Sequence, residues 1–168
     1  MRSSSLLSLS LVLALGLTSA DALAKRVEVT SVTASSEYPA DETGSYEAKK
    51  VADNKVATAW VEGEDRNGLG AWVKLELGGE KEVAKVTFFA GMWYSVKYWD
   101  YSSRPTQVEL EFSDGSTELV TIPNEMTPLE YTLKKPVKTT FVKVTLRNVQ
   151  SGSTFSDTGI SDIVIEDT

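Results

Sequence analysis

The sequence predicts an all-β fold, a β-sandwich of about eight antiparallel strands. Short stretches alternate apolar and polar residues with a period of two, which is the pattern of strands that bury one face. Clusters of Gly, Pro, Asn, Asp and Ser separate these stretches, as in tight turns. Beyond residue 24, no stretch carries a helical period longer than one turn. Two sheets packed face to face account for this pattern.

The expected strands follow one another along the chain at 27–32, 73–77, 84–90, 107–112, 118–122, 129–133, 142–147 and 163–165. Turn residues at Gly78-Gly79, Ser113–Ser116, Pro123-Asn124 and Lys135-Pro136 separate most of them. One short helix is expected over Glu47–Ala52. Two long loops, 34–70 and 91–105, interrupt the strands, and loops of this length usually carry function or are ordered by something bound.

The first 24 residues indicate a secretory signal peptide. Arg2 is followed by an apolar run from Leu6 to Leu17 and by the small-residue cleavage site Ala22-Leu23-Ala24. The run is shorter than the ~20 residues of a membrane-spanning helix, although an uncleaved N-terminal membrane anchor is the alternative. We therefore expect residues 25–168 to form one exported domain, periplasmic or extracellular, and the cleavage site is typical of bacteria.

The composition excludes several classes of function. The chain has no Cys and no His, which excludes disulfides, thiolate catalysis, a Ser-His-Asp triad and a zinc site built from either residue. A net charge of −7 argues against nucleic acid and against anionic lipid surfaces as partners. The metal chemistry that remains is that of hard cations with oxygen ligands, meaning Ca²⁺ or Mg²⁺.

The 91–105 loop is rich in aromatic residues. Flat rings stack on the apolar faces of sugars, and charged neighbours such as Lys97, Asp100 and Arg104 can bind the hydroxyls. The alternative is a loop that folds back and buries its own rings, with Trp99 and Tyr101 as the first candidates. The loop holds five of the chain's aromatic residues: Trp93, Tyr94, Tyr98, Trp99 and Tyr101.

The 34–70 loop contains a candidate cation site. Asp53 and Thr58 lie in a polar turn whose carboxylate, hydroxyl and carbonyl oxygens suit Ca²⁺. Asp162, near the C-terminus, can complete the shell. The alternative is an Asx-turn in which Asp53 caps its own backbone. Trp60, two residues beyond Thr58, is expected in the core.

Five motifs in a fixed order resemble one known family: V-A-D-N at 51–54, T-A-W-V-E-G at 58–63, G-L-G-A-W-V at 68–73, R-P at 104–105 and F-S-D-G at 112–115. Together they resemble the discoidin, or coagulation factor V/VIII C-type, domain of the galactose-binding-like superfold. Within it they are most similar to the bacterial glycan-binding subset named after the translocation domain of a secreted NAD glycohydrolase. The resemblance, from Ser35 to Glu166, implies a jelly-roll sandwich with ligand loops at one end and carbohydrate recognition without catalysis.

The resemblance also implies roles for individual residues. A structural Ca²⁺ is implied at Asp53 and Thr58, with Asp162 where the family often has Glu. The sequence departs from the family at Asn54, where Gly is usual, and at Lys55, where a second Asp is usual. Lys55 places a positive side chain beside the ion, so the site persists only if this position contributes its carbonyl.

Glu62 and Arg104 also match the family pattern, and both are candidates for the ligand pocket. The guanidinium of Arg104 can bridge two sugar hydroxyls or bind a sugar carboxylate. The alternative for Arg104 is a structural ion pair with Asp100 or Glu62.

We therefore expect a secreted, non-catalytic carbohydrate-binding module. A protein-binding or adhesion module that uses the same loops is the alternative. A small glycosidase would need two carboxylates about 5 Å or about 6.5–9.5 Å apart across a cleft, and only Glu62 with Asp65 or Asp100 could form such a pair. The expected ligand-binding residues are Glu62, Trp93, Tyr94, Tyr98, Trp99 and Arg104.

Overall fold

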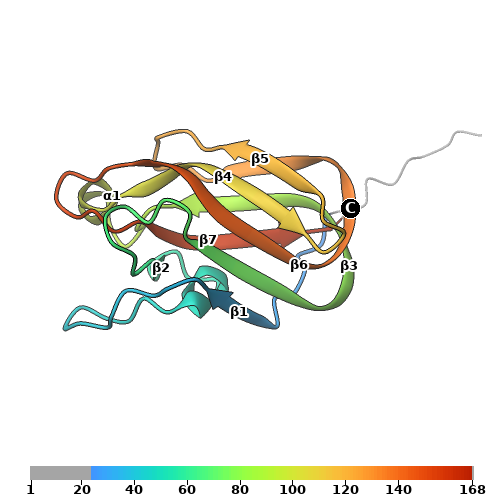
Figure 1. The fold of residues 1–168 in the computed structure, drawn as a ribbon, viewed down its shortest axis with the longest axis horizontal. Coiled ribbons are helices and arrows are strands. Elements are labelled where there is room, and N and C mark those ends of the chain that lie inside the picture. The colour runs from blue at the N-terminus through green and yellow to red at the C-terminus, as the bar shows by residue number, and fades with distance from the viewer. Residues whose placement is uncertain (1–23, 168) are drawn as a thin grey trace, which may run out of the picture.

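A computed structural model describes residues 24–167, and it confirms the all-β sandwich (Figure 1). The expected signal peptide falls almost wholly outside the described residues and stays a prediction. Within residues 24–167, no helix has the length and apolar character needed to cross a membrane. The elements are β1 (Ser31–Ala34), η1 (Ala48–Ala52), β2 (Trp60–Val61), β3 (Trp72–Ala90), α1 (Val96–Tyr101), β4 (Arg104–Phe112), β5 (Thr117–Thr121), β6 (Leu129–Gln150) and β7 (Gly159–Glu166).

Strands β3 and β6 are long because each bends in its middle and contributes to both sheets. The first half of β3 pairs with β1 and with the second half of β6, while residues 85–88 pair with 129–132 and with β7. Gly78 and Gly79, with φ values of 68° and 145°, lie at the bend of β3. The sequence predicted two separate strands here, one before Gly78-Gly79 and one after. In the structure the chain bends there without leaving its partner strand.

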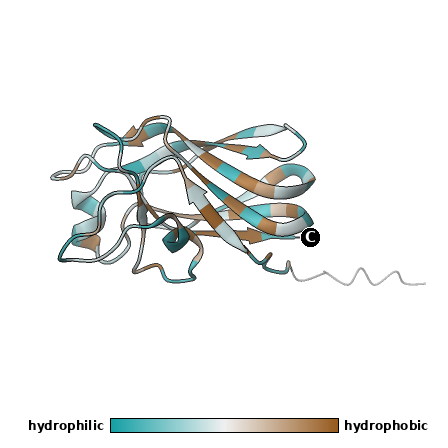
Figure 2. Cartoon of the chain, turned by 60° about the horizontal axis from the view of Figure 1, so that its bottom comes forward, coloured by the Kyte–Doolittle hydropathy of each residue, from teal (hydrophilic) through white to brown (hydrophobic). Residues whose placement is uncertain are grey.

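The strands form two antiparallel layers around an apolar core. They are ordered β2-β7-β3-β6-β4-β5, and β1 pairs with β3. Figure 2 shows apolar and polar bands alternating along the strands, as the period of two predicted. The largest fully buried side chains include Trp60, Phe88 and Phe112, so the expected core position of Trp60 is confirmed. The expected short helix is also confirmed as the 3₁₀ helix η1.

Three connections meet at the same end of the sandwich. Ala90, at the end of β3, pairs with Ile160 near the start of β7, and Arg104, at the start of β4, pairs with Gln150 at the end of β6. The loops that leave these strands therefore lie together with α1, at one end of the ribbon in Figure 1. Residues 35–47 join them, because β1 runs antiparallel to the first half of β3.

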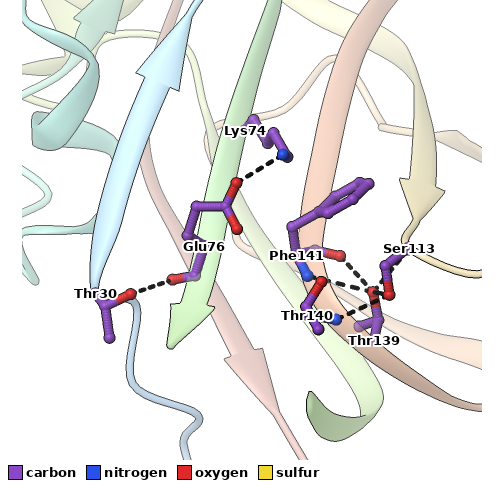
Figure 3. A network of polar contacts seen from close by, with 7 residues as sticks. All are labelled: Thr30, Lys74, Glu76, Ser113, Thr139, Thr140 and Phe141. Carbon is purple, nitrogen blue, oxygen red and sulfur yellow. Dashed lines mark hydrogen bonds and ion pairs between the residues drawn. The ribbon is translucent and has the colours of Figure 1, made fainter. Parts of the chain in front are cut away.

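The opposite end is closed by short turns and polar contacts (Figure 3). Buried Thr139 accepts a hydrogen bond from the Ser113 amide at 2.9 Å and donates to the Phe141 carbonyl at 2.6 Å. Lys74 and Glu76 form an ion pair on the adjacent outer face, and the Glu76 carbonyl accepts from the Thr30 hydroxyl. The long loops at the α1 end are therefore the part of the fold with room for a ligand site.

Candidate functional site

A groove at the α1 end separates the 38–46 loop from the 92–98 segment, and it consists of two adjoining pockets. The Phe155 pocket has a volume of about 150 Å³ and the Tyr94 pocket about 580 Å³. The Phe155 pocket is lined by Tyr38, Asp41, Thr43, Tyr46, Val61, Met92, Tyr98, Ser102, Phe155 and Asp157. The Tyr94 pocket is lined by Thr43, Gly44, Ser45, Tyr46, Lys50, Ala57, Thr58, Ala59, Met92, Tyr94 and Tyr98. The larger volume lies within the range of small-molecule sites.

One wall of the groove is built by the start of α1. Ser95 has an extended backbone, and its side chain accepts a hydrogen bond from the Tyr98 amide at 3.2 Å, which caps the helix. The rings of Tyr94 and Tyr98 meet edge to face, with centroids 5.4 Å apart. Tyr94 is 66% exposed. The sequence missed α1, whose signal is the Ser95 cap, because six residues are too few for a helical period.

The opposite wall is the 38–46 loop, which sequence reasoning left without a role. The Asp41 carboxylate accepts hydrogen bonds from the Thr43 hydroxyl at 2.6 Å and from the amides of Thr43 and Gly44. The Thr43 hydroxyl, followed by the Thr43 amide, holds the pKa of Asp41 below its ordinary value. Burial raises the pKa of Tyr46, whose ring packs edge to face on Tyr38. The D-x-T-G turn between two tyrosines was the available signal.

The third wall is the loop between β6 and β7. The Phe155 amide donates to the Tyr101 carbonyl at 2.7 Å, and the Phe155 ring packs against that of Tyr101. Phe155 is 46% exposed and Asp157 is half-buried, and both line the Phe155 pocket. Sequence reasoning missed both residues, because they follow the β6 strand in a stretch of small polar residues.

Glu62 is fully buried and supports this wall from inside, where the sequence predicted a ligand contact. Its Oε1 accepts from the Thr158 amide at 2.8 Å and its Oε2 accepts from the Glu64 amide at 2.7 Å. Gly68, at φ 64°, packs directly on the Glu62 side chain, where a Cβ would collide with it. Burial raises the pKa of Glu62. Glu62 thus joins its own loop to the one that carries Phe155, and both its oxygens are occupied.

Arg104 is also turned inward, with 7% of its surface exposed. Its Nε donates to the Asn124 side chain at 2.6 Å, and Nη1 donates to the carbonyls of Trp99 and Ser102. Its guanidinium carbon lies 3.8 Å from the centroid of the Trp99 ring. Burial lowers the pKa of Arg104. Neither the expected sugar contact nor the alternative ion pair with Asp100 or Glu62 matches this arrangement, in which Arg104 anchors the end of α1.

Neither indole of the aromatic loop lines the groove. The ring N–H groups of Trp93 and Trp99 donate to the same carbonyl, that of Ala90, each at 2.9 Å. Trp93 also packs edge to face on Phe89, with centroids 5.0 Å apart. Both rings are half-buried, so the loop folds back on itself in part, without enclosing them as the alternative expected. Of the six predicted ligand residues, Tyr94 and Tyr98 line the groove, while Glu62, Trp93, Trp99 and Arg104 do not.

The expected cation site lies beside η1. Asp53 accepts from the Lys55 amide at 3.0 Å, which is the Asx-turn alternative. The Thr58 hydroxyl lies 2.9 Å from both Asp53 oxygens and 2.8 Å from the Lys55 carbonyl. The Thr58 hydroxyl has one proton and can donate to only one of these three oxygens at a time. The oxygens left without a proton are of the kind that coordinate a hard cation. The Lys55 side chain is exposed, so that position offers its carbonyl to the cluster.

Asp162 adds a second carboxylate near this cluster. Burial raises the pKa of Asp162 to about 6, the charge of Arg26 lowers it, and the charge of Asp53 raises it. The Arg26 guanidinium lies 3.9 Å from Asp162 and competes with a cation for that carboxylate. Among residues 24–167, no group of three acidic side chains gathers around a possible metal position. The oxygens that do gather, those of Asp53, Thr58 and the Lys55 carbonyl, are of the kind that Ca²⁺ binds.

Comparison with solved structures supports the sandwich. The family 32 carbohydrate-binding module of Clostridium perfringens NanJ, in complex with galactose, aligns with a TM-score of 0.62 at 17% identity, over 82% of this chain and 93% of that one. The family 32 module of AlyQ, in complex with 4,5-unsaturated mannuronic acid, aligns at 0.57 and 18%, over 84% and 97%. A chitosan-binding module from a Paenibacillus sp. IK-5 chitosanase/glucanase aligns at 0.59 and 14%, over 84% and 97%.

Sequence comparison identifies the family. No curated protein matches the chain. A family model, described as the NAD glycohydrolase translocation F5/8 type C domain, matches residues 24–166, nearly all of the described chain. The match covers the motifs on which the resemblance was based. The chain therefore belongs to the NAD glycohydrolase translocation F5/8 type C domain family.

Proposed function

We propose that this protein is a non-catalytic carbohydrate-binding module that holds a glycan in the groove between residues 38–46 and 92–98. The observation that carries the proposal is the combination of tyrosine rings and polar side chains along this groove. Rings of Tyr46, Tyr94 and Tyr98 offer flat apolar surface to the C–H faces of a sugar, and Thr43 and Asp41 offer hydrogen bonds to hydroxyls. The export that residues 1–24 predict is part of the proposal.

The ligands of the similar structures support a sugar as the ligand. Their names give galactose, an unsaturated mannuronic acid and chitosan. These ligands are neutral, acidic and amine-bearing, so the shared fold accepts sugars of different charge. The choice among them depends on the residues of each groove.

The Asp41 carboxylate of the groove is poorly suited to the acid role in a glycosidase. Asp41 and Asp157 are the two acidic residues that line the Phe155 pocket. A glycosidase needs one carboxyl group with a raised pKa to act as an acid. The pKa of Asp41 is lowered by its hydrogen bonds with Thr43, so it stays ionised and is poorly suited to donate a proton.

A protein partner is the second candidate function. Tyr94, Phe155 and Tyr38 are exposed at the rim of the groove, and Val96 beside them is 73% exposed. Exposed aromatic residues of this kind also form hot spots of protein interfaces. A partner that binds with unchanged affinity in excess free sugar would support this reading.

The test is a glycan array followed by NMR titration of the best ligand. We expect chemical-shift changes confined to residues 38–46, 92–98 and 155–157, weak binding, and no release of new reducing ends from the glycan. Shift changes at the opposite end of the sandwich, or no ligand on the array, would contradict the proposed site. Release of new reducing ends would instead favour a glycosidase.

We also propose that Asp53, Thr58 and Asp162 hold a structural Ca²⁺ with the Lys55 carbonyl. Excess Ca²⁺ at about 100 times its dissociation constant is expected to add about 2.7 kcal/mol to the free energy of unfolding, and EDTA is expected to remove it. Asp53→Ala should abolish the Ca²⁺ effect, whereas Asp114→Ala, in the turn at the opposite end, should leave it intact. Melting curves with Ca²⁺ and with EDTA that superimpose would exclude the ion.

A further inference from the structure

The negative charges that line the Phe155 pocket indicate which kind of glycan the groove binds. Resting on the proposed function, we infer that this pocket receives a protonated amine, so that the bound glycan carries a free amino group, as in a de-N-acetylated hexosamine. This pocket forms one end of the groove and selects a substituent of the sugar, so a neutral or acidic sugar in the same place would be bound less well.

The first support is an excess of negative charge. Two of the ten lining residues, Asp41 and Asp157, are carboxylates, and none of the ten is a lysine or arginine. Asp41 accepts from Thr43, Gly44 and the Tyr46 hydroxyl, which keep it ionised. No hydrogen bond or ion pair joins the half-buried Asp157 carboxylate to another residue within 24–167. A cationic group is therefore the natural partner for Asp157, and the charge of Asp41 adds to the attraction.

The second support is the aromatic lining. Rings of Tyr38, Tyr46, Tyr98 and Phe155 all line the same pocket. The face of an aromatic ring attracts a cation, and several rings around one ammonium group strengthen this attraction. Aromatic rings and carboxylates together favour an amine over a hydroxyl.

The third support is the cost of covering Asp157 with a neutral group. At about 150 Å³ the Phe155 pocket is smaller than a typical ligand site and accommodates one substituent or a single ring. An N-acetyl group fits this volume but has no positive charge. It would cover Asp157 without compensating the charge, and burial of an unpaired carboxylate is costly. The charge of the pocket therefore disfavours the N-acetylated form as well as attracting the free amine.

The rest of the groove differs in charge. Lys50 lines the Tyr94 pocket and is the one cationic side chain among the described residues that line either pocket. A glycan with its amine in the Phe155 pocket would place its hydroxyl-rich remainder beside Lys50. This asymmetry orients the ligand along the groove.

The test compares a fully N-acetylated glucosamine oligomer with the same oligomer carrying one free amine on a terminal unit, by calorimetry in mildly acidic buffer at physiological ionic strength. We expect the free-amine form to bind about tenfold more tightly or better. In Asp157→Asn the ratio of the two affinities should fall several-fold, with affinity for the N-acetylated form retained, while Asp41 and the rings keep a residual preference for the amine. Asp157→Ser provides a second neutral variant. Glu80→Gln, which removes the same charge at the exposed bend of β3, should leave the ratio unchanged.

The outcomes separate this inference from the proposed function. Equal binding of both forms in the groove would overturn the amine pocket and leave the glycan-binding module intact. An equal fall of the ratio in Glu80→Gln and Asp157→Asn would assign the preference to the net charge of −7 and overturn the pocket. Absence of binding to either form and to every glycan on the array would overturn both.

Discussion

Replacement of Tyr98 by alanine is expected to weaken glycan binding by about 2 kcal/mol or more, a factor of about 30. Tyr98 lines both pockets, so its ring contacts a ligand wherever it lies along the groove. It also supports the exposed ring of Tyr94, which would lose its edge-to-face partner. Calorimetric titration of the best glycan from the array measures the loss.

Two controls make the result specific. Tyr98→Phe retains the ring and removes the hydroxyl, so it separates stacking from hydrogen bonding. Leu119→Ala removes a large apolar side chain that is 54% exposed on β5 and lines neither pocket, and it should bind as wild type does. Circular dichroism should show the same fold in all three. Wild-type affinity in Tyr98→Ala would mean that the glycan binds elsewhere.

The alternation of apolar and polar residues predicted the strands well, but it could not distinguish a turn from a bend. Gly78-Gly79 and Lys135-Pro136 have the composition of turns, and both lie where a strand passes from one sheet to the other. The chain bends instead of turning because both halves of β3 pair with the same strand, β6. This pairing joins residues that are distant in sequence, so a local pattern does not reveal it.

The clustering of aromatic residues located one wall of the groove, yet it could not say which rings face outward. The Ala90 carbonyl captures both indole N–H groups, and Asn124 captures Arg104 from 20 residues away. No carbonyl within residues 24–167 holds the Tyr98 hydroxyl in this way, and its ring lines the groove beside Tyr94. The 38–46 wall was missed because its residues form a site only beside the 92–98 segment, and the tertiary fold alone brings them together.

Glu62→Ala is expected to cause the largest loss of stability, about 2–4 kcal/mol in the free energy of unfolding. The change leaves the amides of Thr158 and Glu64 without acceptors and opens a cavity beneath Gly68. Urea unfolding followed by tryptophan fluorescence measures the loss. Glu62→Gln keeps the shape and one acceptor oxygen, so its loss should be smaller.

The pH dependence of stability gives an independent check. Burial raises the pKa of Glu62, so the folded protein holds this proton more tightly than the unfolded chain does. The contribution of the Glu62 proton to the free energy of unfolding is therefore fully present below the ordinary carboxyl pKa, and it is lost as the pH rises through the raised pKa of Glu62. Glu62→Gln does not titrate, and its stability should lack this decline relative to wild type.

Glu64→Ala is the matched control, because Glu64 lies two residues from Glu62, has an exposed side chain, and carries the same charge. Its amide still donates to Glu62, so we expect a change within about 0.5 kcal/mol. Glu62→Ala should also weaken glycan binding, since release of Thr158 loosens the loop that carries Phe155 and Asp157. If Glu62→Ala were as stable as Glu64→Ala and still lost its glycan, direct ligand contact would explain Glu62 better than support of the loops.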